Sequence, residues 1–199
     1  MSKARVEAFS DGIFAIAITL LVLTIAQPAN YNDLARELAD RWPSFAAYAV
    51  SFAVIGIMWL NHHVIFSHFA RVDRGLVYLN LLLLLTIAFV PYPTAIFGQA
   101  LREGHGAGVA AVLYSITMTL NAYAWAALWL YASAGRRLLG PSFPEAQRGT
   151  ATLLFGVGTA GYTVAIGIAF LNPYACLAYH GGFAVYYALD PLGRRAARR

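Results

Sequence analysis

Polar side chains lie within otherwise apolar stretches of this sequence at Ser10, Asp11, Asn61, His62, Asn80 and Asn121, and four of them, Ser10, Asp11, His62 and Asn80, are candidates for one network. A hydroxyl, a carboxylate, an imidazole and an amide are costly in hydrocarbon, so each needs a partner. Together they could relay protons through an Asp/His network. They could equally tie helices to one another by hydrogen bonds. We favour the structural role and keep the proton relay as the alternative.

The composition identifies the class of protein that must position these groups. The chain has 199 residues, of which 60% are hydrophobic and 12% charged. Soluble domains are nearer half apolar and a quarter charged, so this is an integral membrane protein. The net charge of +5 does not imply a nucleic-acid partner, because membrane proteins carry Lys and Arg on cytoplasmic loops. We interpret the Arg-rich C-terminus as an orientation signal that contacts the lipid bilayer.

Six apolar segments are long enough to cross a bilayer as helices. They predict an all-α fold with one transmembrane domain over residues 1–199 and spans at residues 9–26, 45–66, 76–97, 107–132, 150–171 and 174–189. Asn172 and Pro173 predict a tight hairpin between the last two spans.

The basic residues predict the orientation of these spans. With both termini cytoplasmic, 11 of the 14 basic residues lie inside, namely Lys3, Arg5, Arg71, Arg74, Arg136, Arg137, Arg148, Arg194, Arg195, Arg198 and Arg199. The outer side then keeps Arg36, Arg41 and Arg102 among acidic residues. This asymmetry follows the positive-inside rule. In this topology Ser10, Asp11, His62 and Asn80 lie at a similar depth on the cytoplasmic side.

The first span carries an aliphatic stripe. Ile16, Leu20 and Leu23 fall at positions i, i+4 and i+7 and share one face of a helix. Asp11 projects roughly 140° to 180° away from them at about 100° per residue. If the stripe lines a pore, Asp11 faces the protein and holds the helix.

Other motifs do not support enzymatic or metal chemistry. His62, His63 and His68 point in different directions from one helix and cannot converge on a metal ion. Residues 156–163, GVGTAGYT, contain letters of a TVGYG filter in another order inside an apolar span, which favours close helix packing. We find no catalytic motif, and we expect neither an enzyme nor a cofactor.

The pattern Arg5-x-x-x-Phe9-Ser10-Asp11 followed by IFAIAITLLVL resembles the signature of the transmembrane protein 175 family of potassium channels. Trp59 with His62 is similar to the family's Trp-x-x-His, and Asn80 followed by an apolar run to Pro91 is similar to its third span. The resemblance is specific from Arg5 to Pro91.

The resemblance implies a prokaryotic single-repeat channel in the plasma membrane that assembles as a homotetramer. Its first helix would line a central pore that conducts K⁺ with a modest preference over Na⁺. Ile16 would form the main constriction, Leu20 and Leu23 further aliphatic rings, and Thr19 a polar ring. A structural network would fix the pore helix through Arg5, Phe9, Ser10, Asp11, Trp59, His62 and Asn80.

Two other functions remain open on the sequence alone. A proton-coupled or proton-conducting transporter would use Asp11 and His62, although the broken spans in paired repeats that are typical of carriers are not evident. A membrane scaffold would transport nothing.

Overall fold

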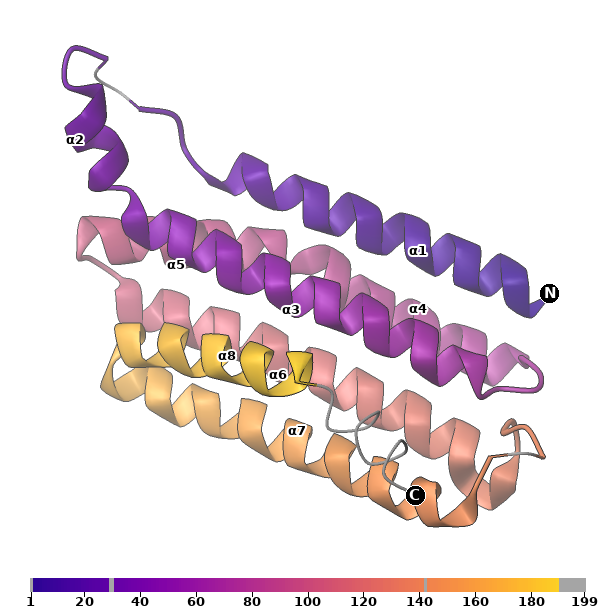
Figure 1. Cartoon of the computed structure of the whole chain (residues 1–199). Coiled ribbons are helices and arrows are strands. Elements are labelled where there is room, and N and C mark those ends of the chain that lie inside the picture. The colour runs from indigo at the N-terminus through magenta and orange to yellow at the C-terminus, as the bar shows by residue number, and fades with distance from the viewer. Residues whose placement is uncertain (1, 29–30, 142, 190–199) are drawn as a thin grey trace.

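The computed structural model describes residues 2–28, 31–141 and 143–189, and its regular structure is helical. The helices are α1 (Lys3–Leu20), the 3-10 turn η1 (Leu21–Thr24), α2 (Leu34–Ala39), α3 (Trp42–Ser67), α4 (Arg74–Phe89), α5 (Pro91–Glu103), α6 (Ala107–Ser133), η2 (Ala134–Arg136), α7 (Glu145–Leu171) and α8 (Pro173–Ala188). All the α-helices except the short α2 run along one long axis (Figure 1). The predicted all-α class is confirmed.

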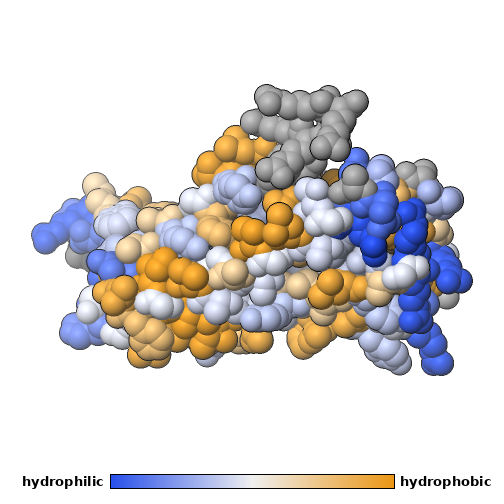
Figure 2. Space-filling view, turned by 90° about the horizontal axis from the view of Figure 1, so that it is seen from below, coloured by the Kyte–Doolittle hydropathy of each residue, from blue (hydrophilic) through white to orange (hydrophobic). Residues whose placement is uncertain are grey.

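Within the described part of the chain, five helical segments are long and apolar enough to cross a bilayer. They are Lys3–Thr24, Trp42–Ser67, Arg74–Glu103, Ala107–Arg136 and Gln147–Leu171. Figure 2 shows hydrophilic residues gathered at the two ends of the long axis, with most of the apolar surface between them. This distribution is that of a membrane protein, because lipid tails offer no hydrogen-bond partners to polar side chains.

The sixth predicted span differs from the other five. α8 begins as predicted, because Asn172 Oδ1 accepts the backbone N–H groups of Tyr174 and Ala175 and Pro173 occupies the first helical turn. The helix has 16 residues, which at 1.5 Å per residue give a length of about 24 Å. A bilayer core is about 30 Å thick, so α8 is not among the five segments.

Two other boundaries differ from the sequence expectation. The first helix begins at Lys3 rather than at residue 9, because its polar first turns remain helical. The third span, predicted over residues 76–97, is divided between α4 and α5 at Val90. Pro91 and Pro93 lack the N–H groups that would continue the α4 hydrogen-bond ladder, so the break falls where the prolines begin.

The described basic residues lie at the two ends of the bundle. The N-terminus lies at the same end as the α3–α4 and α6–α7 connections (Figure 1). This end is held together by Lys3 Nζ, which donates to the Phe69 carbonyl at 3.0 Å, and by a β-bridge between Phe69 and Leu139. The predicted contributions of Arg194, Arg195, Arg198 and Arg199 lie outside the described residues.

The filter-like segment, residues 156–163, is part of α7 and packs against α8. A Cβ atom on Gly158 would collide with the Tyr187 hydroxyl, and one on Gly161 would collide with the Phe183 ring. Gly156 and Gly167 meet nothing within 4 Å, so close packing explains only some of the small residues on this helix.

Candidate functional site

The first helix has two faces of opposite character. Its buried face, which packs against the bundle, consists of Val6, Ser10, Phe14, Ala17 and, at the start of η1, Leu21. On the other side the aliphatic stripe leaves the protein: Ile16 is 60% exposed, Leu20 43% and Leu23 76%. In a 3-10 turn residues three apart eclipse one another, so η1 keeps Leu23 in line with Leu20.

The buried face of α1 is fixed by a chain of three side chains. The Asn80 amide nitrogen donates to Ser10 Oγ at 2.9 Å, and the Asn80 carbonyl oxygen lies 2.9 Å from His62 Nε2. The three residues come from α4, α1 and α3, and at most 1% of each is exposed. The structure therefore brings together three of the four polar residues that the sequence places at one depth.

Ser10, at one end of this hydrogen-bonded chain, determines which groups donate and which accept. Ser10 Oγ donates its own proton to the Val6 carbonyl at 2.8 Å, so it must accept from Asn80. The Asn80 oxygen then faces His62 Nε2, which must carry a hydrogen. An amide neither gains nor loses a proton at ordinary pH, so Asn80 interrupts a proton relay between His62 and Ser10. The geometry is that of structural hydrogen bonds.

Aromatic side chains enclose the other surfaces of the His62 imidazole. The ring stacks on Phe66 at a centroid distance of 4.1 Å and meets the edges of Phe14 at 5.4 Å and Trp125 at 6.0 Å. His63 is exposed, and His68 follows the end of α3, where its ring meets Phe143. Among the described residues no group of three His, Cys, Asp or Glu side chains could hold a metal ion.

Asp11 does not join the chain of Ser10, Asn80 and His62 as the sequence suggested. Its carboxylate accepts the indole N–H of Trp59 at 2.9 Å, at the exposed junction of α1 and α3. Asp11 is one residue, about 100°, around the helix from Ser10, so the two neighbours reach different helices. Ser10 joins α1 to α4 and Asp11 joins α1 to α3.

Arg5 and Phe9 lie apart from the chain of Ser10, Asn80 and His62. Phe9 is 55% exposed, and Arg5 is exposed and forms no ion pair with any described residue. Both lie within about 20° of Ile16 on the helical wheel, because they precede it by 11 and 7 residues. They therefore belong to the exposed face of α1 rather than to the face that contacts the bundle.

Two tethers at the ends of the first span were not expected from the sequence. Lys3 binds the Phe69 carbonyl at one end, as described above. At the other end Arg41 Nη1 donates to the Ala26 carbonyl at 2.9 Å, while its Nη2 pairs with Glu37 at 3.1 Å. Arg41 is only 3% exposed. A backbone carbonyl carries no sequence signal, so neither contact could be read from residue types.

Asp73 is a charged residue at the N-terminal end of the bundle, where it caps α4. Asp73 accepts the Leu76 backbone N–H at 2.9 Å, the Tyr131 hydroxyl at 2.9 Å and Arg137 Nη2 at 3.0 Å. The Leu76 hydrogen bond, aided by Tyr131 and Arg137, lowers the pKa of this carboxyl below its ordinary value. Nearby, partial burial lowers the pKa of His68, and the charge of Lys3 adds to this effect.

These observations define an integral membrane protein whose first helix is anchored on one face and bare on the other. Residues 5–91 match the family described as endosomal/lysosomal potassium channel TMEM175. A protein named a potassium channel from Streptomyces collinus is 47% identical over 94% of this chain and 92% of its own length. The chain belongs to the TMEM175 family, which comprises ion channels and is not a class of enzymes.

Two further relatives are a solved structure and a human protein. The crystal structure of a lysosomal potassium-selective channel TMEM175 homologue from Chamaesiphon minutus superposes with a TM-score of 0.84 at 38% identity, covering 94% of this chain and 96% of that one. A human protein named endosomal/lysosomal proton channel TMEM175 is 39% identical over 46% of this chain and 20% of its own length.

Proposed function

We propose that this chain is a potassium-selective, leak-type channel that assembles as a homotetramer in a prokaryotic plasma membrane. In this proposal four copies of α1 surround a central pore, and K⁺ permeates without any cofactor. The observation that carries the proposal is the two-faced α1. Its polar groups hold it to α3 and α4, and its aliphatic stripe is left free to meet other copies.

The proposed constriction consists of Ile16, Leu20 and Leu23. One stripe on one chain cannot enclose water, so a pore requires several copies around an axis. A ring of aliphatic side chains can close a pore by excluding water. Thr19 lies about 60° around the helix from Ile16 and would add a ring of hydroxyls beside this constriction.

The proposal includes six spans with both termini cytoplasmic. The described basic residues at the N-terminal end of the bundle support this orientation, because Arg36, Arg41 and Arg102 at the other end lie among acids, with Glu37 contacting two of them. α8 would be the sixth span, since a bilayer thins to match a short apolar helix. Its packing against α7 through Gly158 and Gly161 supports a transmembrane hairpin.

The proton-transporter alternative receives less support from this site. A carrier that used Asp11 and His62 would need a proton path between them. Asp11 binds Trp59 on the exposed edge of α1, whereas His62 binds Asn80 in the interior. Asn80 separates His62 from Ser10, which leaves no chain of titratable groups between the carboxylate and the imidazole.

Purified protein in liposomes tests the proposal. We expect passive K⁺ flux that collapses a gradient, and we expect Ile16→Ala to increase it several-fold by widening the constriction. Leu85→Ala is the matched control, because Leu85 is 66% exposed on α4 and should face lipid. Saturable, proton-dependent uptake would indicate a carrier, and no flux would indicate a scaffold. Equal effects of the two variants would remove Ile16 from the constriction.

A further inference from the structure

A second feature of the bundle lies away from α1: a cavity between α3, α6, α7 and α8. It offers about 80 Å³ to the centres of water-sized molecules. About 10–15 Å³ of such volume holds one water, so the cavity has room for several waters or for a small organic molecule. Its walls are mostly apolar and include Met58, Trp125 and Leu154. Asn121, near the middle of α6, contributes to its lining.

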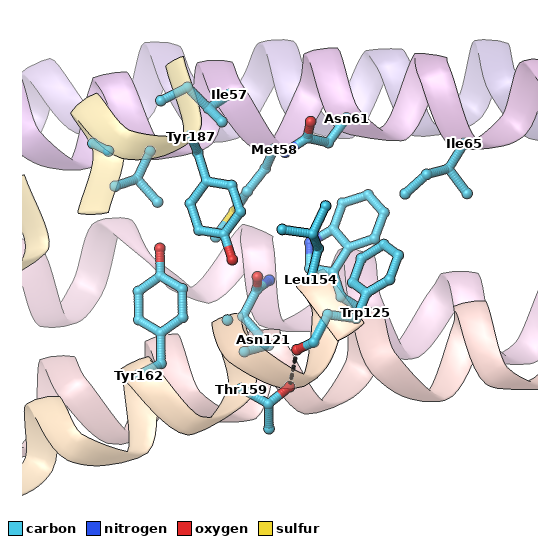
Figure 3. A pocket seen from close by; sticks show the side chains of 15 residues that line it. Ile57, Met58, Asn61, Ile65, Asn121, Trp125, Leu154, Thr159, Tyr162 and Tyr187 are labelled. Carbon is cyan, nitrogen blue, oxygen red and sulfur yellow. Dashed lines mark hydrogen bonds between the residues drawn. The ribbon is translucent and has the colours of Figure 1, made fainter. Parts of the chain in front are cut away.

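Asn121 has an unsatisfied acceptor at this cavity. Its residue is 1% exposed, and its Oδ1 atom has no hydrogen-bond partner among the described residues. Figure 3 shows the Asn121 amide and the hydroxyl of Tyr187 pointing toward the same space. An unpaired buried carbonyl costs about 1–3 kcal/mol, so a molecule that donates to it would be stabilised.

The orientation of the amide is determined by its other end. Asn121 Nδ2 donates to Thr86 Oγ1 at 2.8 Å, and Thr86 Oγ1 donates its own proton to the Leu83 carbonyl at 2.7 Å. The Thr86 oxygen can therefore only accept from Asn121, and a flipped amide would lose this bond. The group presented to the cavity is the carbonyl oxygen, which selects a donor.

The Thr159 hydroxyl in the lining is a second hydrogen-bond acceptor beside the Asn121 carbonyl oxygen. Thr159 Oγ1 donates its proton to the Phe155 carbonyl at 2.8 Å, the dashed bond in Figure 3, and keeps its lone pairs free. Tyr187 reaches the cavity because Gly158 opposite it has no side chain. Water could satisfy Asn121. However, a cluster of waters large enough to fill the space would face mainly apolar walls and lose hydrogen bonds there.

We propose that this cavity binds a small apolar molecule with a single hydrogen-bond donor, of the class of medium-chain alcohols and phenols. The donor would bind Asn121 Oδ1, and the hydrocarbon part would lie against Met58, Trp125 and Leu154. Such molecules dissolve in the bilayer. The half-buried residues Ile57, Asn61 and Tyr187 border the cavity, so it lies close to the surface of the described bundle. This site is independent of the proposed pore.

Photolabelling of the purified full chain tests the site. The probe is an octanol that carries a diazirine, and its methyl ether is the matched compound without the donor. We expect the alcohol to label cavity residues such as Met58 and Tyr187, to be displaced by excess octanol, and to exceed the ether by about fivefold, the effect of one neutral hydrogen bond. Equal labelling by alcohol and ether, or labelling that excess octanol does not displace, would overturn the proposal and leave water as the occupant.

Two variants locate the acceptor. Asn121→Leu should abolish the preference for the alcohol, while Asn61→Leu, which changes another amide in the lining, should keep it. Loss of the preference in Asn61→Leu but not in Asn121→Leu would show that Asn61 is the acceptor and would overturn the proposal. Should Asn121→Leu fail to fold because it also loses Thr86, the alcohol-to-ether comparison in the unmodified chain decides alone.

Discussion

The Asn80 amide nitrogen lies 2.9 Å from Ser10 Oγ, and this bond joins α4 to the buried face of α1. The carbonyl oxygen of the same amide meets His62 from α3 at 2.9 Å. One side chain therefore fixes the relative positions of three helices. Because hydrocarbon offers no competing partners, these bonds persist where surface hydrogen bonds would exchange with water.

Replacing this amide tests its role as a junction. Asn80→Ala breaks both bonds and leaves Ser10 and His62 each short of a partner. It should lower the free energy of unfolding by about 1–3 kcal/mol. Ser10→Ala breaks only one of the two bonds, so its cost should be smaller, at about 0.5–1.5 kcal/mol. Thermal unfolding in detergent measures both. An equal loss in the two variants would mean that the His62 bond contributes nothing.

The sequence predicted this junction better than it predicted the rest of the site. Few polar groups occur in the spans, and topology placed Ser10, His62 and Asn80 at one depth, so their meeting followed from the need for partners. The same reasoning misplaced Asp11. Depth placed Asp11 in the same network, whereas its position about 100° around the helix from Ser10 turns it toward α3 and an indole N–H.

The contacts that the sequence missed have a common physical origin. Arg41 and Lys3 bind backbone carbonyls, at Ala26 and Phe69, which every residue possesses. Such partners depend on the path of the chain and not on residue types. Phe9 was expected in the interior by resemblance. On the wheel it belongs with Ile16, on the exposed face of α1.

The Arg41 tether predicts local mobility at the far end of α1. Arg41→Gln removes the bond to Ala26, while Glu37 keeps Arg102 at 3.6 Å. A hydrogen bond from a charged group contributes about 1.5–3 kcal/mol, so amide exchange over residues 21–26 should accelerate by about tenfold or more. Hydrogen–deuterium exchange with mass spectrometry measures this rate.

Arg36→Gln is the matched control for the tether. Arg36 lies on the neighbouring turn of the chain, its side chain is 78% exposed, and it pairs with Asp40 on the surface at 3.9 Å. Exposed pairs contribute about 0–1 kcal/mol, so exchange at residues 21–26 should not change. Equal acceleration in both variants would attribute the effect to lost charge rather than to the Ala26 bond.

Asp73 predicts a dependence of stability on pH. Its pKa is lowered in the folded state, so the carboxylate stabilises the fold above its ordinary pKa of about 3.9 and loses this effect as pH falls through the lowered value. Asp73→Asn keeps a side-chain acceptor for Leu76 but removes the charge beside Arg137. The variant should melt below the unmodified protein at pH 7, and the difference should shrink as the pH falls below about 3.9.

Melting temperatures between pH 7 and pH 3 test this expectation. Asp40→Asn is the control, since the Asp40 side chain is 63% exposed at the opposite end of the bundle. It should show a much smaller difference at every pH. A constant difference for Asp73→Asn down to the lowest pH would show that the capping geometry, and not the charge, accounts for the loss.

The Thr19 hydroxyl predicts an effect on the K⁺/Na⁺ permeability ratio. Its hydroxyl donates to the Ile16 carbonyl at 2.9 Å, so its lone pairs point away from the helix and could coordinate a cation. Thr19→Val keeps the shape and removes the oxygen. In the proposed pore the K⁺/Na⁺ permeability ratio should fall, because a purely aliphatic neck would retain only the easier dehydration of the larger ion. Reversal potentials under bi-ionic conditions measure the ratio.

Thr24→Val is the control, because Thr24 donates in the same way to Leu21 but is half-buried. An unchanged ratio in Thr19→Val would leave the aliphatic rings as the source of any selectivity, since no other side-chain oxygen belongs to the proposed stripe.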